Sequence, residues 1–242
     1  MAVKTANGTY FYGVLIEPKS PILKFDSTIM VPAPSKQPEE GGVIAQWVGL
    51  QPSPQLMQNV ITNEGTNGQW AFEPFFCCHL LEMVHTNSTL LNSSTQLTSQ
   101  VYPGDALTTL FRWNPLCQTW YDNWLVTVGD KRHAAGELPI GGGLVLGPFN
   151  QLYADHSTTN KPYALLQIEL QQGMFWDWGT VYFRDILVEA QTQTTEWCTG
   201  SWTVYEGRDT LIWNRTTPIA TVNVGVNTTT CYVASIVFIG HK

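Results

Sequence analysis

The stretch Trp47-Val48-Gly49-Leu50-Gln51-Pro52 closes a run of residues that alternate between two faces, and it ends in a turn. Alternation with a period of two is the pattern of a β-strand whose two faces differ. The chain also holds ten tryptophans, whereas only 13% of its residues are charged. The stretch therefore predicts a protein built from sheets, with an aromatic and weakly charged surface or groove.

The same alternation recurs along the chain, and no helical stripe of three turns or more interrupts it. Turn residues at 103–105 and 141–143 separate the runs, which favours an antiparallel sandwich or jelly roll over units of alternating strands and helices. We expect a single all-β domain over residues 1–242. About ten strands are predicted, at residues 10–16, 24–31, 42–50, 69–78, 106–113, 120–128, 164–170, 180–189, 202–206 and 231–239.

The net charge of the chain limits the classes of molecule that it is expected to bind. Twelve Lys and Arg against nineteen Asp and Glu give a net charge of −7 and an isoelectric point near 5.1. This balance argues against nucleic acid and against anionic membrane surfaces. The sequence has no long apolar run, and its N-terminus lacks the pattern of a secretory signal. We therefore expect neither a nucleic-acid nor a membrane partner, and a cytoplasmic location, or secretion if a leader has been removed.

Cysteines and glycosylation sequons give weaker signals. The five cysteines are Cys77, Cys78, Cys117, Cys198 and Cys231, an odd number with two adjacent members. That pattern is not typical of a secreted disulfide framework, so we expect mostly free, buried thiols. Sequons begin at Asn7, Asn87, Asn92, Asn214 and Asn227. Because Ser and Thr are abundant, chance alone produces several of them.

The run at residues 163–171 separates a core face from a surface face. The core face is expected to hold Leu166, Ile168 and Leu170, and the other face Leu165, Gln167, Glu169 and Gln171. In a strongly bent sheet one face packs on a second sheet, and the opposite face forms a groove. Other polar residues in the middle of predicted strands are Gln46, Glu73 and Arg112.

The sequence contains few motifs that are typical of a catalytic or metal-binding site. The sequence has neither a Gly-x-Ser-x-Gly elbow nor a Cys-x-x-Cys pair, and we expect no metal and no cofactor. Glu73 and Glu169 are the best candidates for a general acid and base that face one groove. The alternative is that each glutamate only accepts hydrogen bonds, from Arg112, a Trp N–H or a neighbouring Gln.

Tryptophan gives the stronger functional signal. In Trp176-Asp177-Trp178 the two indoles lie on one side of an extended segment and the acid lies on the other. An indole stacked on the C–H face of a sugar, beside amides and carboxylates that bind hydroxyl groups, is a common solution for carbohydrate binding. At least half of the ten tryptophans are nevertheless expected in the core.

Several short motifs follow one another in order over residues 20–190. They are the run at 27–32, the hairpin at 38–42, Trp47-Val48-Gly49-Leu50, Gln58, the aromatic strand around Trp70, the turn at 103–105, and Trp178-Gly179-Thr180-Val181 with Phe183. This series resembles the glutamic peptidases called eqolisins. Members of that family are similar in shape to legume-type lectins and glucanases. The resemblance implies a bent, two-sheet, concanavalin A-like sandwich with a concave face.

In eqolisins a glutamine and a glutamate on the concave face activate water at acidic pH. The resemblance gives the glutamine role to Gln58, with Gln55 as a nearby alternative. It places Leu165 where the family has its glutamate, and Glu169 follows four residues later, about 13 Å along a strand that rises roughly 3.3 Å per residue. Glu169 therefore lies on the same face of the strand as the family's glutamate, but not at the same position along it. This departure favours a binding protein on the same scaffold.

We therefore predict a lectin-like, carbohydrate-binding protein whose Trp-rich concave groove takes a glycan or an extended polymer. The alternative is an eqolisin-like acid peptidase or related hydrolase that acts through Gln58 and a groove glutamate, for which Glu169 is the candidate. The residues expected to line the groove are Trp47, Gln58, Trp70, Glu73, Trp113, Gln167 and Glu169. The open edges of such a sandwich also allow a homodimer.

Overall fold

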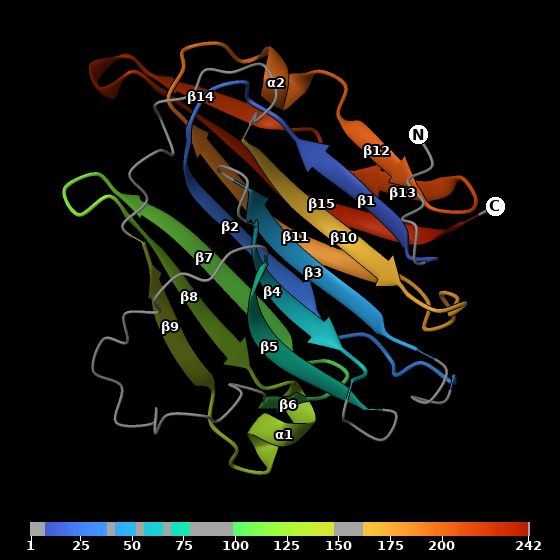
Figure 1. Cartoon of the computed structure of the whole chain (residues 1–242). Helices are drawn as coiled ribbons and strands as arrows, with labels where there is room; N and C mark the ends of the chain where they lie inside the picture. The colour runs from blue at the N-terminus through green and yellow to red at the C-terminus, as the bar shows by residue number, and fades with distance from the viewer. Residues whose placement is uncertain are drawn as a thin grey trace.

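The computed structural model describes residues 8–37, 42–51, 56–64, 69–77, 99–147 and 162–241. These residues form two antiparallel sheets that pack face to face, and the seven-stranded sheet lies in front of the other in Figure 1. The prediction of an all-β, two-sheet sandwich is confirmed. The architecture is compatible with the concanavalin A-like fold that the resemblance implied.

The seven-stranded sheet has the strand order β12-β1-β10-β3-β4-β5-β6. Its members are β1 (Tyr10–Ile16), β3 (Ile44–Gln51), β4 (Leu56–Thr62), β5 (Trp70–Cys77), β6 (Ser99–Val101), β10 (Tyr163–Leu170) and β12 (Thr203–Glu206). All of its strand pairs are antiparallel.

The second sheet has the order β13-β15-β11-β2-β7-β8-β9, and β14 pairs with β15. Its members are β2 (Ile22–Met30), β7 (Ala106–Asn114), β8 (Thr119–Thr127), β9 (Ile140–Leu146), β11 (Val181–Ala190), β13 (Leu211–Arg215), β14 (Ile219–Asn223) and β15 (Thr228–His241). Three short helical turns complete the described elements: α1 (Asp130–Ala134), α2 (Glu196–Thr199) and η2 (Val224–Val226).

Each of the ten predicted strands is present, with small shifts at its ends. The structure adds β4, in which the polar pair Gln58 and Asn59 interrupts the hydrophobic alternation. It also adds the short strands β6, β13 and β14. The glycines at 141–143 were expected to break the chain, but they lie within β9. A Cβ atom at Gly142 would come within 2.6 Å of the Trp124 ring, so glycine there lets this indole pack beside β9.

The core between the sheets is strongly aromatic. Its tryptophans are Trp70, Trp120, Trp124, Trp176 and Trp178, half of the ten in the chain, as predicted. The rings of Trp70 and Trp178 meet edge to face, with 5.6 Å between their centroids. The indole N–H of Trp70 donates to the backbone carbonyls of Pro32 and Ala33, at 3.2 Å each. Burying rings of this size supplies much of the apolar area that stabilises a sandwich.

The segment Trp176-Asp177-Trp178 shows the predicted alternation. Both indoles face the core, with 6.1 Å between their ring centroids. Asp177 accepts hydrogen bonds from the Ser35 hydroxyl at 2.7 Å and from the Lys36 backbone N–H at 3.0 Å. The carboxylate thereby ties the chain after β2 to the segment that precedes β11.

One carboxyl group is buried between the two sheets. Asp122 on β8 is 2% exposed, and its Oδ1 accepts a hydrogen bond from Nδ2 of Asn59 on β4 at 2.7 Å. Removal from water disfavours the ionised carboxylate, so burial raises the pKa of Asp122 to about 7, although the Asn59 hydrogen bond acts in the opposite direction. The hydrogen bond between Asn59 and Asp122 thus joins the two sheets, through a carboxyl group whose neutral form is favoured by burial.

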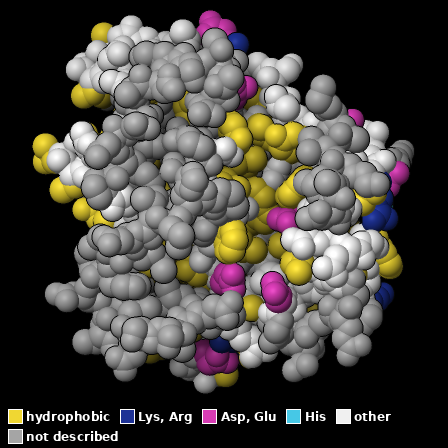
Figure 2. Space-filling model, in the orientation of Figure 1, with side chains coloured by type: hydrophobic (Ala, Val, Ile, Leu, Met, Phe, Trp, Pro, Cys, Tyr) yellow, Lys and Arg dark blue, Asp and Glu magenta, His cyan; other side chains and the backbone are white. Residues whose placement is uncertain are grey.

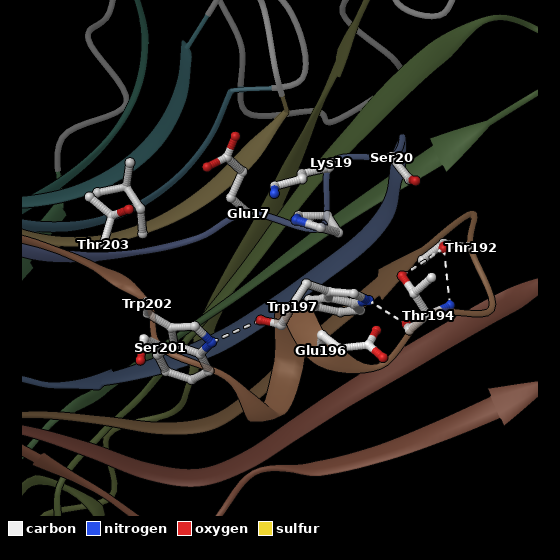
Figure 3. Close-up of a pocket in the computed structure, with 12 residues that line it drawn as sticks. Glu17, Lys19, Ser20, Thr192, Thr194, Glu196, Trp197, Ser201, Trp202 and Thr203 are labelled. Carbon is white, nitrogen blue, oxygen red and sulfur yellow. Dashed lines mark hydrogen bonds between the residues drawn. The ribbon is translucent and has the colours of Figure 1, made fainter.

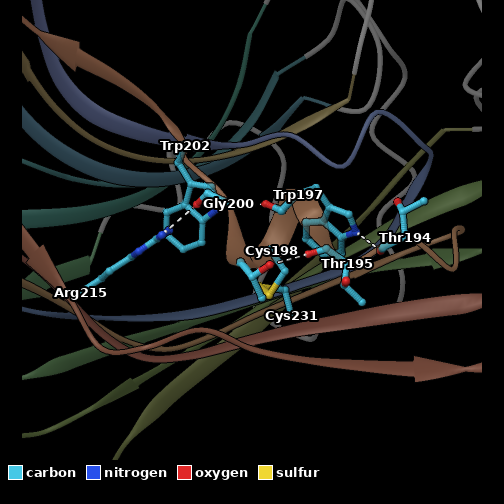
Figure 4. Close-up of a disulfide and its surroundings, with 9 residues drawn as sticks. Thr194, Thr195, Trp197, Cys198, Gly200, Trp202, Arg215 and Cys231 are labelled. Carbon is cyan, nitrogen blue, oxygen red and sulfur yellow. Dashed lines mark hydrogen bonds between the residues drawn. A yellow bond between two sulfur atoms is a disulfide. The ribbon is translucent and has the colours of Figure 1, made fainter.

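The prediction of mostly free, buried thiols was wrong. Cys198 on α2 and Cys231 on β15 form a disulfide, with 5.4 Å between their Cα atoms (Figure 4). The two residues are 33 positions apart, so the bond depends on α2 lying against β15, which no count of cysteines reveals. Cys117 is free but exposed. The Cys77 side chain and Cys78 lie outside the described residues.

We predict that Asp122→Asn stabilises the protein at neutral and alkaline pH. An unperturbed aspartate has a pKa of 3.8, so between that pH and about 7 the unfolded chain loses a proton that the folded chain keeps. The stability from protonated Asp122 is fully present below pH 3.8, declines as the pH rises, and is lost above about 7. Asparagine keeps an acceptor for Asn59 but does not ionise. Urea unfolding should show a larger gain for the variant at alkaline than at acidic pH, and an equal effect at both would contradict the assignment.

Candidate functional site

The outer face of the seven-stranded sheet, turned away from the second sheet, carries most of the predicted site residues. Side chains alternate along each strand, and the antiparallel register lines up those of the outer face in rows across the sheet. The Trp47 row consists of Gly13, Gln167, Trp47, Val60 and Glu73. The neighbouring Gln58 row consists of Leu15, Leu165, Gly49, Gln58 and Phe75.

A pocket of about 330 Å³, which we call the central pocket, lies over these rows. Its aromatic side chains are Phe11, Trp47, Phe75, Tyr163 and Tyr205. Its remaining side chains are Leu56, Leu165, Gln51, Gln58, Gln167 and Glu169. Figure 2 views this face and shows hydrophobic side chains gathered at its centre, with acidic side chains beside them. Among the described residues that line the pocket there is neither Lys nor Arg.

Trp47 forms the floor of the central pocket. Its side chain is only 2% exposed and packs with Leu15 and Leu165 on the outer face. A Cβ atom at Gly49 would lie 2.9 Å from the Trp47 ring, so glycine at this position leaves room for the indole to lie along its strand. The close contact explains why β3 reads Trp-Val-Gly at residues 47–49, which lie within the strand.

Glu169 is held in place by two donors. Nε1 of Trp47 donates to its Oε2 at 3.2 Å, and Nε2 of Gln171 donates to its Oε1 at 2.7 Å. This is the arrangement that the sequence analysis kept open as the alternative to catalysis, in which the acid accepts from a Trp N–H and a neighbouring Gln. The carboxylate therefore serves as an oriented acceptor at the pocket wall.

Gln58 does not face Glu169 across the sheet. It is 6% exposed, and the residue in its row on β10 is Leu165, with Gly49 between them. The register thus keeps Glu169 four residues away along β10. Among the described outer-face carboxylates, Glu73 on β5 is the closest to Gln58 in register, since it is diagonal to Gln58, a spacing of roughly 7–8 Å. Gln55, the alternative glutamine, lies outside the described residues.

Glu73 has a perturbed acidity. Burial raises its pKa, and the negative charge of Glu64 raises it further. Both effects disfavour the ionised carboxylate. Glu73 therefore holds its proton to a higher pH than an exposed glutamate does.

Two tyrosines form part of the pocket rim. The hydroxyl of Tyr163 donates to Oε1 of Gln51 at 2.6 Å. Burial raises the pKa of Tyr163 and of Tyr205, and the charge of Glu17 raises both further. Both phenols therefore stay protonated at neutral pH and can act as hydrogen-bond donors.

Trp70 and Trp113 do not reach the central pocket, which corrects the expectation of a Trp-rich groove. The Trp70 side chain lies in the core, where its N–H is used by backbone carbonyls. Trp113 belongs to β7 of the second sheet and packs beside Trp120, with 5.6 Å between ring centroids. Trp47 is the only tryptophan among the described lining residues. The structure brings it together with Gln58, Gln167 and Glu169, with Glu73 in the same row as Trp47.

Seven lining residues were not among those predicted to line the groove, although Leu165 was placed on the correct face: Phe11, Gln51, Leu56, Phe75, Tyr163, Leu165 and Tyr205. Two of them carry a readable signal, because Tyr163 lies two residues before Leu165 and Phe75 two residues after Glu73, so each shares a face with a predicted residue. Phe11 and Tyr205 need the pairing of β1 with β10 and β12, which alternation within one strand does not supply.

Within the described ranges, no group of three or more His, Cys, Asp and Glu side chains is arranged to hold a metal ion. Those ranges also contain no helix that is long and apolar enough to cross a membrane.

No protein-family model matches the chain, and a comparison with curated proteins finds no match. The function is therefore inferred from the geometry of the central pocket.

Proposed function

We propose that this protein binds a neutral carbohydrate in the central pocket. The observation that supports the proposal is that five aromatic rings, three glutamines and one glutamate surround a single hollow. Ring faces pack on the C–H faces of sugars, while amide groups both donate to and accept from hydroxyl groups. Phe75, which is 45% exposed, offers the most accessible ring.

The charge of the pocket favours a neutral ligand. Glu169 is the one carboxylate among the described lining residues, and it would repel an anion. Phosphate or sulfate recognition uses Lys, Arg or clustered backbone donors, and the described lining has no basic side chain. Gln58 and Gln167 instead present uncharged donors and acceptors beside the Trp47 floor.

The compartment belongs to the same proposal. The sequence predicted a cytoplasmic protein, or a secreted one if a leader has been removed. The Cys198–Cys231 disulfide supports secretion, because such bonds persist in oxidising compartments and are rare in the cytosol. An extracellular location would also bring the central pocket into contact with cell-surface and cell-wall polysaccharides.

The proposal predicts that Phe75→Ala weakens glycan binding. On an array of neutral glycans at neutral pH, the wild-type protein should give a selective signal that free sugar competes away. Loss of the exposed ring should reduce affinity for that glycan by about 1–3 kcal/mol, the usual range for an aromatic anchor. Phe175→Ala is the matched control, since Phe175 is also exposed but lines neither pocket described here. Equal losses in both variants, or an empty array, would refute the proposal.

A second candidate function rests on Gln58 and Glu73. In this candidate, an acid peptidase or related hydrolase, ionised Glu73 takes a proton from water as the water oxygen attacks the carbonyl carbon. The Gln58 amide donates to the developing oxyanion, and Glu73 returns the proton to the leaving nitrogen as the C–N bond breaks. The observation that favours this function is the diagonal placement of the two side chains on neighbouring strands.

If the protein is a hydrolase, Glu73→Gln and Gln58→Ala should each abolish cleavage of a peptide library at acidic pH. Glu169→Gln should retain most of it, because Glu169 is four residues from the Gln58 row and is already bonded to Trp47 and Gln171. Retained cleavage in both of the first two variants would exclude this mechanism. Loss of cleavage in Glu169→Gln alone would return the catalytic role to Glu169.

A further inference from the structure

A second pocket, of about 500 Å³, lies beside the central pocket; we call it the side pocket (Figure 3). Its walls come from two segments that are distant in sequence. One is the end of β1 with the turn that leads to β2, and the other runs from Thr192 through α2 to the start of β12. Neither segment carries a functional motif that is recognisable in the sequence.

Two indoles in the side pocket are fixed by backbone hydrogen bonds. Nε1 of Trp197 donates to the carbonyl of Thr194 at 2.8 Å, and Nε1 of Trp202 donates to the carbonyl of Trp197 at 3.0 Å (Figure 3). Because both N–H groups are engaged, the ring faces and edges are what the indoles offer to a ligand. Both side chains are partly exposed.

The surroundings hold this aromatic pair rigidly. Arg215 lies over the Trp202 ring, with 3.9 Å from Cζ to the ring centroid, and its Nη2 donates to the Gly200 carbonyl at 2.9 Å. The Cys198–Cys231 disulfide anchors α2 directly beside Trp197 (Figure 4). A site that is ordered before binding loses less conformational entropy when a ligand arrives.

The polar groups of the side pocket suit a neutral, hydroxyl-rich ligand. Glu17, Glu196 and Lys19 all line it, so an ion of either sign would meet a like charge. The hydroxyl groups of Ser20 and Thr203 add donors and acceptors of no net charge. With the two indoles, this is the same combination of ring faces and uncharged polar groups that lines the central pocket.

The side pocket and the central pocket lie on the same face of the same sheet. Leu15, which lines the side pocket, belongs to the Gln58 row and pairs with Leu165, which lines the central pocket. Thr203 pairs with Leu15 and extends that row to β12. The charge of Glu17 in the side pocket also acts on Tyr163 and Tyr205 at the rim of the central pocket. From β12 to β5 the row crosses five strand spacings, about 24 Å at roughly 4.8 Å each.

We propose that the side pocket is a second subsite for the same carbohydrate, so that the ligand is an extended neutral oligosaccharide that lies across the strands from Trp197 to Phe75. This inference rests on the proposed function. It adds the length and direction of the ligand, and it assigns Trp197 as a binding residue.

The test compares long and short ligands by isothermal titration calorimetry. The probes are the linear, neutral hexasaccharides of glucose, mannose and xylose, each with its disaccharide. For a hexasaccharide that the wild-type protein binds, Trp197→Ala should weaken binding about tenfold, the effect of losing one aromatic anchor. Its effect on binding in the central pocket, measured with the disaccharide, should be negligible. Phe175→Ala should leave both affinities unchanged.

Glu17→Gln provides an independent variant, because it keeps the size of the side chain while it removes a charged acceptor at the junction of the pockets. It should weaken hexasaccharide binding in the same selective way, and thermal unfolding checks that both variants fold. Wild-type affinity for the hexasaccharide in folded Trp197→Ala and Glu17→Gln would overturn this inference and leave the proposed function standing. Failure of the wild-type protein to bind any of the sugars would overturn both.

Discussion

The register of β3 between β10 and β4 is the constraint on which the outer face depends. Every residue from Ile44 to Leu50 is buried, so β3 packs on both of its faces. Val48 faces the core, and Trp47 faces the outer cluster. A slip of one residue would exchange these faces and place the indole in the core and the valine in the pocket. The contact between the Trp47 ring and Gly49 helps to fix this register, because only glycine leaves the required space.

The same register decides which chemistry the outer face can support. It aligns Leu165, Gly49 and Gln58 in one row, so the place opposite Gln58 on β10 is apolar. It leaves Glu169 bonded to Trp47 and Gln171 and puts Glu73 diagonal to Gln58. A face with several rings and amides but dispersed carboxylates is better suited to holding a ligand than to splitting one. For this reason carbohydrate binding ranks above hydrolysis.

Alternation in the sequence was sufficient to predict the fold class and to tell which residues of several strands face the core. It gave ten of the described strands and placed Leu166, Ile168 and Leu170 in the core, where they lie. It also placed Leu165, Gln167 and Glu169 on the opposite face, which lines the central pocket. These features depend on contacts within one strand or on the two faces of one sheet, and a period of two records them directly.

Features that depend on pairing between distant segments were not predictable in this way. Composition gave no means to tell Trp70, which lies in the core, from the pocket residue Trp47, since both lie on strands rich in apolar residues. The Cys198–Cys231 disulfide and the Trp197 wall of the side pocket arise from the position of α2 against β15, which joins residues 33 positions apart in the sequence. β4 was missed because its two central polar residues face opposite sides, Gln58 toward the pocket and Asn59 toward Asp122 in the core.

A crystal structure of the protein soaked with the neutral hexasaccharides would test the central claim most directly. The account predicts sugar density on the outer face of the seven-stranded sheet, packed on Phe75 in the central pocket and continuing across β10 and β1 toward Trp197. Density confined to the eight-stranded sheet or to a crystal contact would contradict it, as would crystals that take up none of the sugars while the central pocket is open to solvent.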